Sequence, residues 1–323
     1  MSIAGHAIRV HYLNSELESL LSKAFVQQPS TEHADPGLTI YVCDFDSMPA
    51  AYPVPPWKSD SQMEFGADVQ RPMLHFRDER FVGLFEPRSS LLSLLDTESN
   101  LAVWCIPRRN QIPHYELSAP FRPIIHWWMG QQGLQIVHAG AVASENVAVL
   151  LVGRSGSGKS TTSLSSLGAG LRYLSDDYVL VEDLQSPVAW SLYRTAKLFQ
   201  SDLESFPHLA DTVGDISFAN SDKAIMYLGP THLSQADSGF PIGAILLPTV
   251  VDSGKTRLTE VSAATCLSAM APSTMLQLRG SGHPDFERLG RLACRVPSYR
   301  LELGADRNAI QQTMLDLMGN LQK

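Results

Sequence analysis

The chain has 323 residues, of which 44% are hydrophobic and 18% are charged, and its formal net charge at pH 7 is −8. This length is enough for two domains with their own cores, and the acidic balance argues against a nucleic-acid-binding surface. No run of 18 apolar residues occurs, so we expect no membrane span, and the first residues lack the pattern of a secretory signal. The four cysteines are scattered without a CxxC pair, which favours a reducing compartment. We therefore expect a cytoplasmic protein with neither a nucleic-acid partner nor a membrane partner.

The first part of the chain, residues 1–125, predicts a small α/β module. Its apolar stretches and their spacing predict strands at Ala7–Leu13, Leu38–Cys43, Leu91–Asp96 and Leu101–Ile106, a hairpin from Gln70–Arg77 and Arg80–Glu86, and a helix at Ser15–Phe25. No motif in this part carries a recognisable chemistry. We expect it to contribute substrate recognition or packing.

The second part, residues 126–323, predicts a mixed sheet with flanking helices. The predicted strands are Leu134–Val142, Val147–Val152, Arg172–Leu174, Tyr178–Glu182, Ala244–Leu247, Arg257–Val261 and Tyr299–Leu303. A helix is predicted from Lys159 to the Gly168-Ala-Gly punctuation, and a last helix is predicted to begin after Asp306 as its N-cap. The fold class is therefore α/β in both parts.

The most specific motif is Gly153–Ser160, which reads Gly-Arg-Ser-Gly-Ser-Gly-Lys-Ser and is a complete GxxxxGK[ST] phosphate loop. It follows a predicted strand and opens a predicted helix, so backbone N–H groups and the helix N-terminus can converge on a phosphate. Lys159 supplies a charge for the β/γ-phosphates, and the Ser160 hydroxyl is a ligand for Mg²⁺. The predicted nucleotide-binding residues are Gly153, Arg154, Ser155, Gly156, Ser157, Gly158, Lys159, Ser160 and Thr161.

Two adjacent carboxylates, Asp176 and Asp177, follow a predicted strand after the loop. Phosphoryl transfer needs one carboxylate for Mg²⁺ and one for the proton of the acceptor hydroxyl. Adjacent side chains of an extended segment point to opposite sides, so the two would have distinct roles. The competing interpretation of the pair is an Asp-Asp turn between strands. His138 lies one strand upstream and is a candidate for a role near the aspartates. The competing interpretation of His138 is a structural histidine.

Two cations further along, Arg194 and Lys197, are candidates for phosphate or acceptor contacts. Positive charge on the transferring phosphoryl group would stabilise the transition state. The alternative is that both are ordinary surface cations.

Three segments together resemble the catalytic domain of HPr kinase/phosphorylase: His138-Ala-Gly, Gly153–Ser160, and the run from Gly170 to Asp177. They look more like the HPr-kinase-related proteins of bacterial peptide biosynthesis clusters, including the lasso-peptide precursor kinases. The resemblance is densest over residues 134–182 and extends to Tyr193–Leu198 and Arg295–Gly304. It implies transfer of a phosphoryl group from ATP, with Mg²⁺, to a serine hydroxyl of a peptide or small molecule.

The resemblance also implies roles for single residues. It favours Asp176 as the base, because the family places the first aspartate beside the histidine, here His138, and Asp177 would then join Ser160 as a metal ligand. The alternative exchanges the roles of the two aspartates. Members of this family often form oligomers, so a homo-oligomer is expected as well. The glycine-rich signature and basic loop of true HPr kinases are not found after the aspartates, and the candidate substitutes are Asn220–Lys223 and Arg279–His283.

Three functions follow from these patterns. The favoured one is an ATP-dependent serine kinase of the HPr-kinase-like class. The second is a true HPr kinase/phosphorylase in carbon regulation, and the third is a non-catalytic nucleotide-binding scaffold. A scaffold has no physical need for Lys159, Ser160 and both aspartates together, which is why the kinase is favoured.

Overall fold

The computed structural model describes residues 1–25, 35–44, 63–65, 72–206, 209, 223–233, 239–251 and 254–322. The chain forms two compact units, one of Met1–Gly133 with Met275–Gly282 and one of Leu134–Thr274 with His283–Lys323. Both units combine sheets with helices, so the fold is mixed α/β. The expected boundary after residue 125 would cut the helix Arg122–Gln131, whereas the compact units divide after Gly133. That residues 126–323 form a catalytic domain that folds on its own remains a prediction.

The described residues of the first unit form an eight-stranded sheet. Its strands are β1 (Ser2–Ile3), β2 (His6–Tyr12), β3 (Leu38–Asp44), β4 (Met63–Phe65), β5 (Pro72–Arg77), β6 (Phe81–Glu86), β7 (Leu91–Asp96) and β8 (Leu101–Ile106). They lie in the order β1-β2-β3-β8-β7-β6-β5-β4. The central neighbours β2, β3 and β8 are parallel, and the strands from β8 to β4 form an antiparallel meander. The predicted hairpin of β5 and β6 is confirmed.

Among the described residues of the first unit, three α-helices occur: α1 (Ser15–Leu21), α2 (His114–Ser118) and α3 (Arg122–Gln131). The Asn14 side chain caps α1 by accepting a hydrogen bond from the Glu16 N–H at 2.8 Å. Trp104 of β8 is fully buried and donates its indole N–H to the Glu116 carboxylate at 3.0 Å. A buried polar pair of this kind is tolerated because it is hydrogen-bonded.

The second unit is built on a sheet with the strand order β10-β9-β12-β13-β16-β18-β17. The strands are β9 (Leu134–Ala143), β10 (Ala148–Val152), β12 (Tyr178–Glu182), β13 (Val188–Ser191), β16 (Phe240–Val250), β17 (Arg257–Val261) and β18 (Ser298–Leu303), with β11 (Arg172–Ser175) paired to β9. The long strand β16 also pairs in parallel with β10. Two further strands, β14 (Thr195–Phe199) and β15 (Lys223–Tyr227), pair with each other as a separate antiparallel ribbon.

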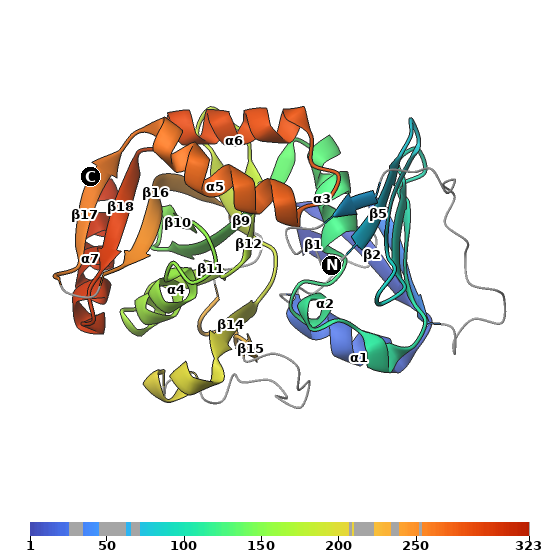
Figure 1. Ribbon diagram of the computed structural model, residues 1–323, viewed down its shortest axis with the longest axis horizontal. Helices are drawn as coiled ribbons and strands as arrows, with labels where there is room; N and C mark the ends of the chain where they lie inside the picture. The colour runs from blue at the N-terminus through green and yellow to red at the C-terminus, as the bar shows by residue number, and fades with distance from the viewer. Residues whose placement is uncertain are drawn as a thin grey trace. The chain divides into compact units, whose positions relative to one another are not determined.

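Helices cover both faces of this sheet: α4 (Lys159–Gly168), α5 (Ala263–Gln277), α6 (His283–Arg295) and α7 (Arg307–Leu321). Figure 1 shows α4 and α6 on opposite sides of the strands. Side chains alternate along β9, so Gly140 faces Ser163 of α4, while Val137 lies with Leu289 on the α6 side. Asp306 caps α7 by accepting from the Asn308 N–H at 2.9 Å, as predicted.

The strand predictions for the second unit are confirmed, with β12 and β17 at their predicted bounds. The ribbon β14–β15, strand β13 and helices α5 and α6 were not predicted. Within the part of the chain that the structure describes, no helix is long and apolar enough to span a bilayer.

Candidate active site

The phosphate loop connects β10 to α4, as its motif predicts. The tightest position is Gly158, the N-cap of α4, which has a φ of 105°. A Cβ there would lie 2.3 Å from Leu303 Cδ1 of β18. Only glycine combines this left-handed backbone with so close a neighbour. The loop is therefore fixed against the sheet, and the first N–H groups of α4 are available at its end.

Lys159, the first residue of α4, reaches back over the loop. Its ammonium donates hydrogen bonds to the backbone carbonyls of Gly153 at 2.8 Å and Arg154 at 3.2 Å, and the residue is 6% exposed. Burial lowers the pKa of Lys159, and the two nearby aspartates act against this shift. A buried ammonium over a glycine-rich loop is the arrangement that phosphate binding requires.

Asp176, directly after β11, is buried to 1% exposure. Its Oδ2 accepts a hydrogen bond from the Lys197 backbone N–H at 2.9 Å, and its Oδ1 has no hydrogen-bond partner among the described residues. Burial and the Asp177 charge raise the pKa of Asp176 to about 6, although the Lys197 N–H and the nearby Ser160 hydroxyl act to lower it. The orphaned oxygen thus lies in the neighbourhood of the loop serine.

Asp177 occupies a different environment, with a side chain that is 26% exposed. Its Oδ2 lies 2.6 Å from Lys197 Nζ, and its Oδ1 lies 3.7 Å from His138 Nε2. Burial acts to raise the pKa of Asp177, but Lys197 and His138 outweigh it and hold the pKa well below its usual value. This carboxylate is ionised and has an exposed edge.

The histidine therefore neighbours the second aspartate, and the expectation that Asp176 lies beside His138 is wrong. The reason is the strand register, because Tyr178 of β12 pairs with His138 of β9 and brings the preceding residue, Asp177, to the histidine. The His138 and Tyr178 rings lie 5.6 Å apart, and the backbone N–H of His138 donates a hydrogen bond to Thr274 Oγ1 at 3.1 Å. Burial lowers the pKa of His138, with Asp177 acting against this shift, so the ring is neutral at pH 7.

Lys197 joins the two aspartates. Its backbone N–H binds Asp176 and its ammonium binds Asp177. Burial acts to lower the pKa of Lys197, but Asp177 outweighs it and the pKa is raised. The sequence left open whether Lys197 is an ordinary surface cation, and these contacts place it in the carboxylate cluster.

The remaining candidates are Arg194 and the two segments Asn220–Lys223 and Arg279–His283. Arg194 is half-buried before β14, and its Nε has no hydrogen-bond partner among the described residues. Residues 220–222 lie outside the described residues, and Lys223 is the first residue of β15. Arg279–Gly282 belongs to the first unit, where the Arg279 carbonyl accepts from Trp127 Nε1 at 2.6 Å.

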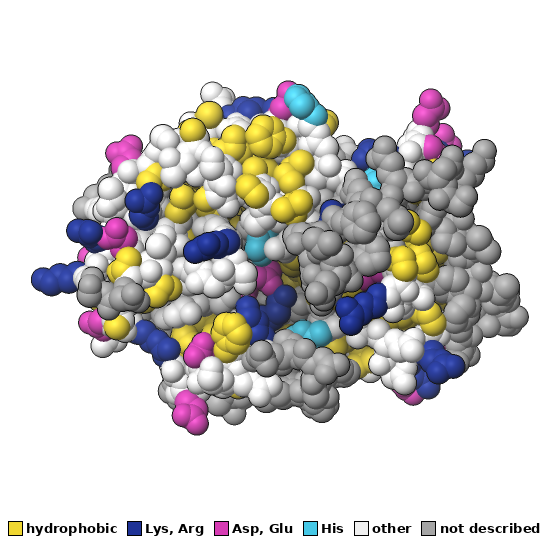
Figure 2. Space-filling model, in the orientation of Figure 1, with side chains coloured by type: hydrophobic (Ala, Val, Ile, Leu, Met, Phe, Trp, Pro, Cys, Tyr) yellow, Lys and Arg dark blue, Asp and Glu magenta, His cyan; other side chains and the backbone are white. Residues whose placement is uncertain are grey.

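In Figure 2, acidic, basic and histidine side chains come together on the surface between the places of β12 and β14 in Figure 1. Among the described residues, no group of three or more His, Cys, Asp or Glu side chains could hold a metal ion. Mg²⁺ in nucleotide sites needs fewer, since one or two protein oxygens and the substrate phosphates complete its shell. The orphaned Asp176 Oδ1 and the neighbouring Ser160 hydroxyl fit that requirement.

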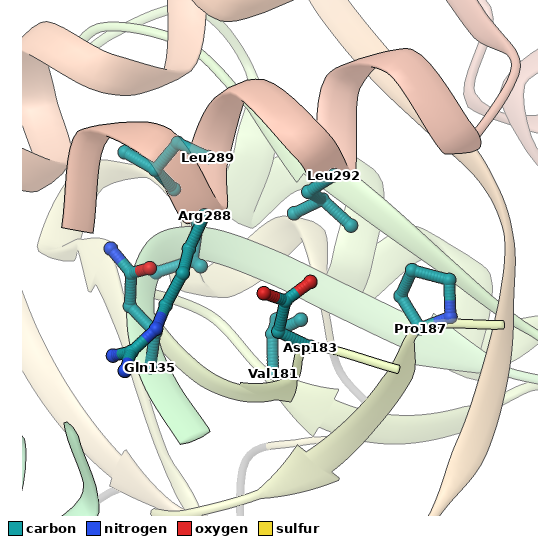
Figure 3. Close-up of a pocket in the computed structure, with 8 residues that line it drawn as sticks. Gln135, Val181, Asp183, Pro187, Arg288, Leu289 and Leu292 are labelled. Atoms are coloured by element: carbon teal, nitrogen blue, oxygen red, sulfur yellow. The ribbon is translucent and has the colours of Figure 1, made fainter. Parts of the chain in front are cut away.

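A separate pocket lies on the opposite face of the sheet, under α6 (Figure 3). It is lined by Gln135, Val137, Val181, Asp183, Pro187, Arg288, Leu289 and Leu292. Asp183 in its wall is clamped by Arg291 and Arg295, with N···O distances of 2.6 and 2.9 Å. None of the predicted site residues lines it, so it is distinct from the phosphate loop.

Comparison with known proteins gives similarity to solved structures. A scan against protein-family models and a search of curated proteins both give no match. Among solved structures, the chain is similar to the Hpr(Ser) kinase/phosphatase from Coxiella burnetii, with 10% sequence identity, a TM-score of 0.32, and coverage of 58% of this chain and 99% of that one.

Proposed function

We propose that this protein is an ATP-dependent phosphotransferase that transfers the γ-phosphoryl group to a hydroxyl of a peptide or small-molecule acceptor. The observation that carries the proposal is the meeting of a complete phosphate loop with two unlike carboxylates. One is buried near Ser160, and the other is half-buried beside His138 and Lys197. The motif resemblance adds a serine of a biosynthetic peptide as the acceptor we expect.

The nucleotide phosphates would be held by the loop N–H groups, the N-terminus of α4 and the Lys159 ammonium. Asp176 and Ser160 would hold the metal ion, because Asp176 is buried and has an oxygen without a hydrogen-bond partner. Bound Mg²⁺ neutralises charge on the phosphate oxygens. This assigns the metal to the first aspartate rather than the second.

Asp177 is then the carboxylate on the acceptor side, since it alone of the pair has an exposed edge. The acceptor oxygen forms a bond to the γ-phosphorus, the bond from that phosphorus to the β–γ bridging oxygen breaks, and ADP leaves. The hydroxyl proton passes to Asp177. A base with a low pKa suits a loose transition state in which the acceptor keeps its proton until late.

His138 and Lys197 orient this base. Each lies against a different oxygen of the Asp177 carboxylate, so the group has one arrangement relative to the loop. Fixed geometry of this kind accounts for much of the rate in phosphoryl transfer.

The proposal is tested by incubating the purified protein with Mg²⁺, ATP and a peptide or extract fraction, and following phosphate gain by mass spectrometry. The Lys159→Ala variant is the control. A product that appears with the native protein and is absent with this variant supports the kinase. Tight binding of ATP without phosphate transfer to any acceptor would favour the scaffold instead.

A further inference from the structure

We propose that Cys43 of β3 and Cys105 of β8 are a redox-active pair, which hydrogen peroxide oxidises to a reversible disulfide across the sheet of the first unit. The inference is independent of the proposed function, because both cysteines lie in the first unit and the phosphate loop lies in the second. It assigns a modification site to the part of the chain in which no motif carries a recognisable chemistry.

The strand register brings the two cysteines together. β3 and β8 are parallel neighbours, and Cys43 is the direct partner of Cys105. Opposed residues of neighbouring strands point to the same side of the sheet, and the strands lie about 4.8 Å apart. The Cα atoms of a disulfide are about 4.4–6.8 Å apart, so this spacing suits one. The Cys43 thiol also donates a hydrogen bond to the carbonyl of Trp104, the residue before Cys105, at 3.7 Å.

The spacing of the strands also indicates that the disulfide is reversible. The Cβ atoms of a disulfide lie about 3.5–4.5 Å apart, which is closer than two neighbouring strands lie to each other. Closing the bond therefore draws β3 and β8 together slightly. A bond formed against such resistance is reduced more easily than a relaxed structural disulfide, which is the behaviour of regulatory disulfides in reducing compartments.

The two thiols are buried in a small apolar cluster. Cys43 and Cys105 are 2% and 0% exposed, and they pack with Leu92 and against the partly buried Phe85 and Val103. Thiol reactivity depends on access, so this burial excludes glutathione and other proteins from the folded state. Hydrogen peroxide is small and uncharged, which is why it is the oxidant of the proposal.

The contact between the two thiols makes them unequal. Cys105 is the main cause that lowers the pKa of Cys43, and it outweighs burial and the Asp44 charge, which act to raise it. The same contact and burial raise the pKa of Cys105. Because the thiolate is the nucleophile, Cys43 reacts first and Cys105 closes the disulfide.

The reaction consumes one molecule of peroxide. The Cys43 sulfur forms a bond to a peroxide oxygen, the O–O bond breaks, and the leaving oxygen takes the thiol proton and departs as water, which leaves a sulfenic acid. The Cys105 sulfur then forms a bond to the Cys43 sulfur, the S–O bond breaks, and a second water leaves with the Cys105 proton. The two sulfurs are oxidised and the peroxide is reduced to water.

The test uses the full chain with Cys294→Ser, because Cys294 is the exposed cysteine and its own oxidation would obscure the result. The folded, reduced protein is treated with hydrogen peroxide, unfolded, alkylated and measured by intact mass spectrometry. Before alkylation the chain should lose about 2 Da, because two thiol hydrogens leave. Peptide mapping should find Cys43 linked to Cys105, and dithiothreitol should restore both thiols.

Cys266 is the matched internal control. It is buried as completely as Cys105 but lies in the second unit, so it should stay a free thiol under the same treatment. Equal oxidation of Cys266 would show that the chain had opened and would overturn the proposal for the folded state.

Substitution of each thiol tests the order of the two steps. With Cys105→Ser the reaction should stop at the Cys43 sulfenic acid, which dimedone traps. With Cys43→Ser the dimedone adduct should be weak, because burial raises the pKa of Cys105. A strong adduct on Cys105 alone would overturn the assignment of Cys43 as the attacking thiol.

The linkage measurement keeps the proposal falsifiable even if a variant of the pair does not fold. If Cys43 and Cys105 both remain available for alkylation after treatment of the folded chain, or become linked only when urea is present during oxidation, the pair is purely structural and the proposal is wrong. Linkage of either cysteine to a second chain would overturn it as well.

Discussion

The pKa of Asp176 makes nucleotide binding with Mg²⁺ depend on pH in a range where ordinary carboxylates do not titrate. Burial and Asp177 raise this pKa to about 6. A pKa of about 6 leaves about 90% of the carboxyl ionised at pH 7 and about 10% at pH 5. Because only the ionised form ligates Mg²⁺ well, the Mg²⁺-dependent part of ATP affinity should fall about ninefold over this interval.

The assay is titration of a fluorescent ATP analogue at several pH values, with Mg²⁺ and with EDTA. The pH dependence should be present with Mg²⁺ and weak in EDTA, and Asp176→Asn should abolish it because the amide does not titrate. Asp177→Asn is the matched control, since removing the neighbouring charge should move the transition to lower pH rather than remove it. A transition that survives unchanged in Asp176→Asn would refute the assignment of the metal to this residue.

Four further outcomes are expected. Lys159→Ala should abolish turnover by removing the charge that meets the β/γ-phosphates, and near-native activity would exclude the loop as the nucleotide site. Asp177→Asn should lower kcat about 10²–10⁴-fold with little change in ATP affinity, because the amide cannot accept the hydroxyl proton. Added Mg²⁺ should partly restore the activity of Asp176→Asn but not that of Asp177→Asn. Rescue in the opposite order would exchange the roles of the two aspartates. Residues 134–323 produced alone should bind nucleotide, and a fragment folded by circular dichroism but without affinity would count against an independent catalytic unit. Burial raises the pKa of Glu116 from 4.5 to about 7, so the folded state holds this proton more tightly. The free energy of unfolding should then drop by about 3 kcal/mol as the pH rises from about 4.5 to about 7. Urea unfolding at several pH values should show this decrease in the native protein and not in Glu116→Gln.

The sequence predicted those parts of the site that lie in consecutive residues. The loop Gly153–Ser160 carries its own geometry, because glycines, lysine and serine at fixed spacing specify a strand–loop–helix phosphate site. The strands beside it were predicted because β9, β10 and β12 are apolar runs between turn residues. Local pattern was sufficient for these elements.

Features that depend on pairing between distant segments were not predictable in this way. The partner of His138 is set by the register of β12 on β9, and an assignment by resemblance chose the wrong aspartate. Helix α5 was missed although Cys266, Met270 and Thr274 lie on one face, because an apolar residue, Leu276, also lies on its exposed side and Pro272 interrupts the pattern. Periodicity reports burial within one element, and it contains no information on which element lies opposite.

Lys197 shows why the ribbon β14–β15 matters for the chemistry. A lysine in a mixed segment such as Tyr-Arg-Thr-Ala-Lys is usually a solvated surface residue, and nothing in its sequence neighbourhood predicts contacts with residues 20 and 21 positions earlier. The structure gives it two bonds, from its backbone to Asp176 and from its ammonium to Asp177, so displacement of this strand would disturb the metal side and the acceptor side together. Since β14 pairs only with β15 among the described strands, its position depends on the apolar face that it packs against α4 and against Tyr173 of β11, and not on strand pairing with the main sheet. Packing on that face is therefore part of what sets the geometry of the two carboxylates.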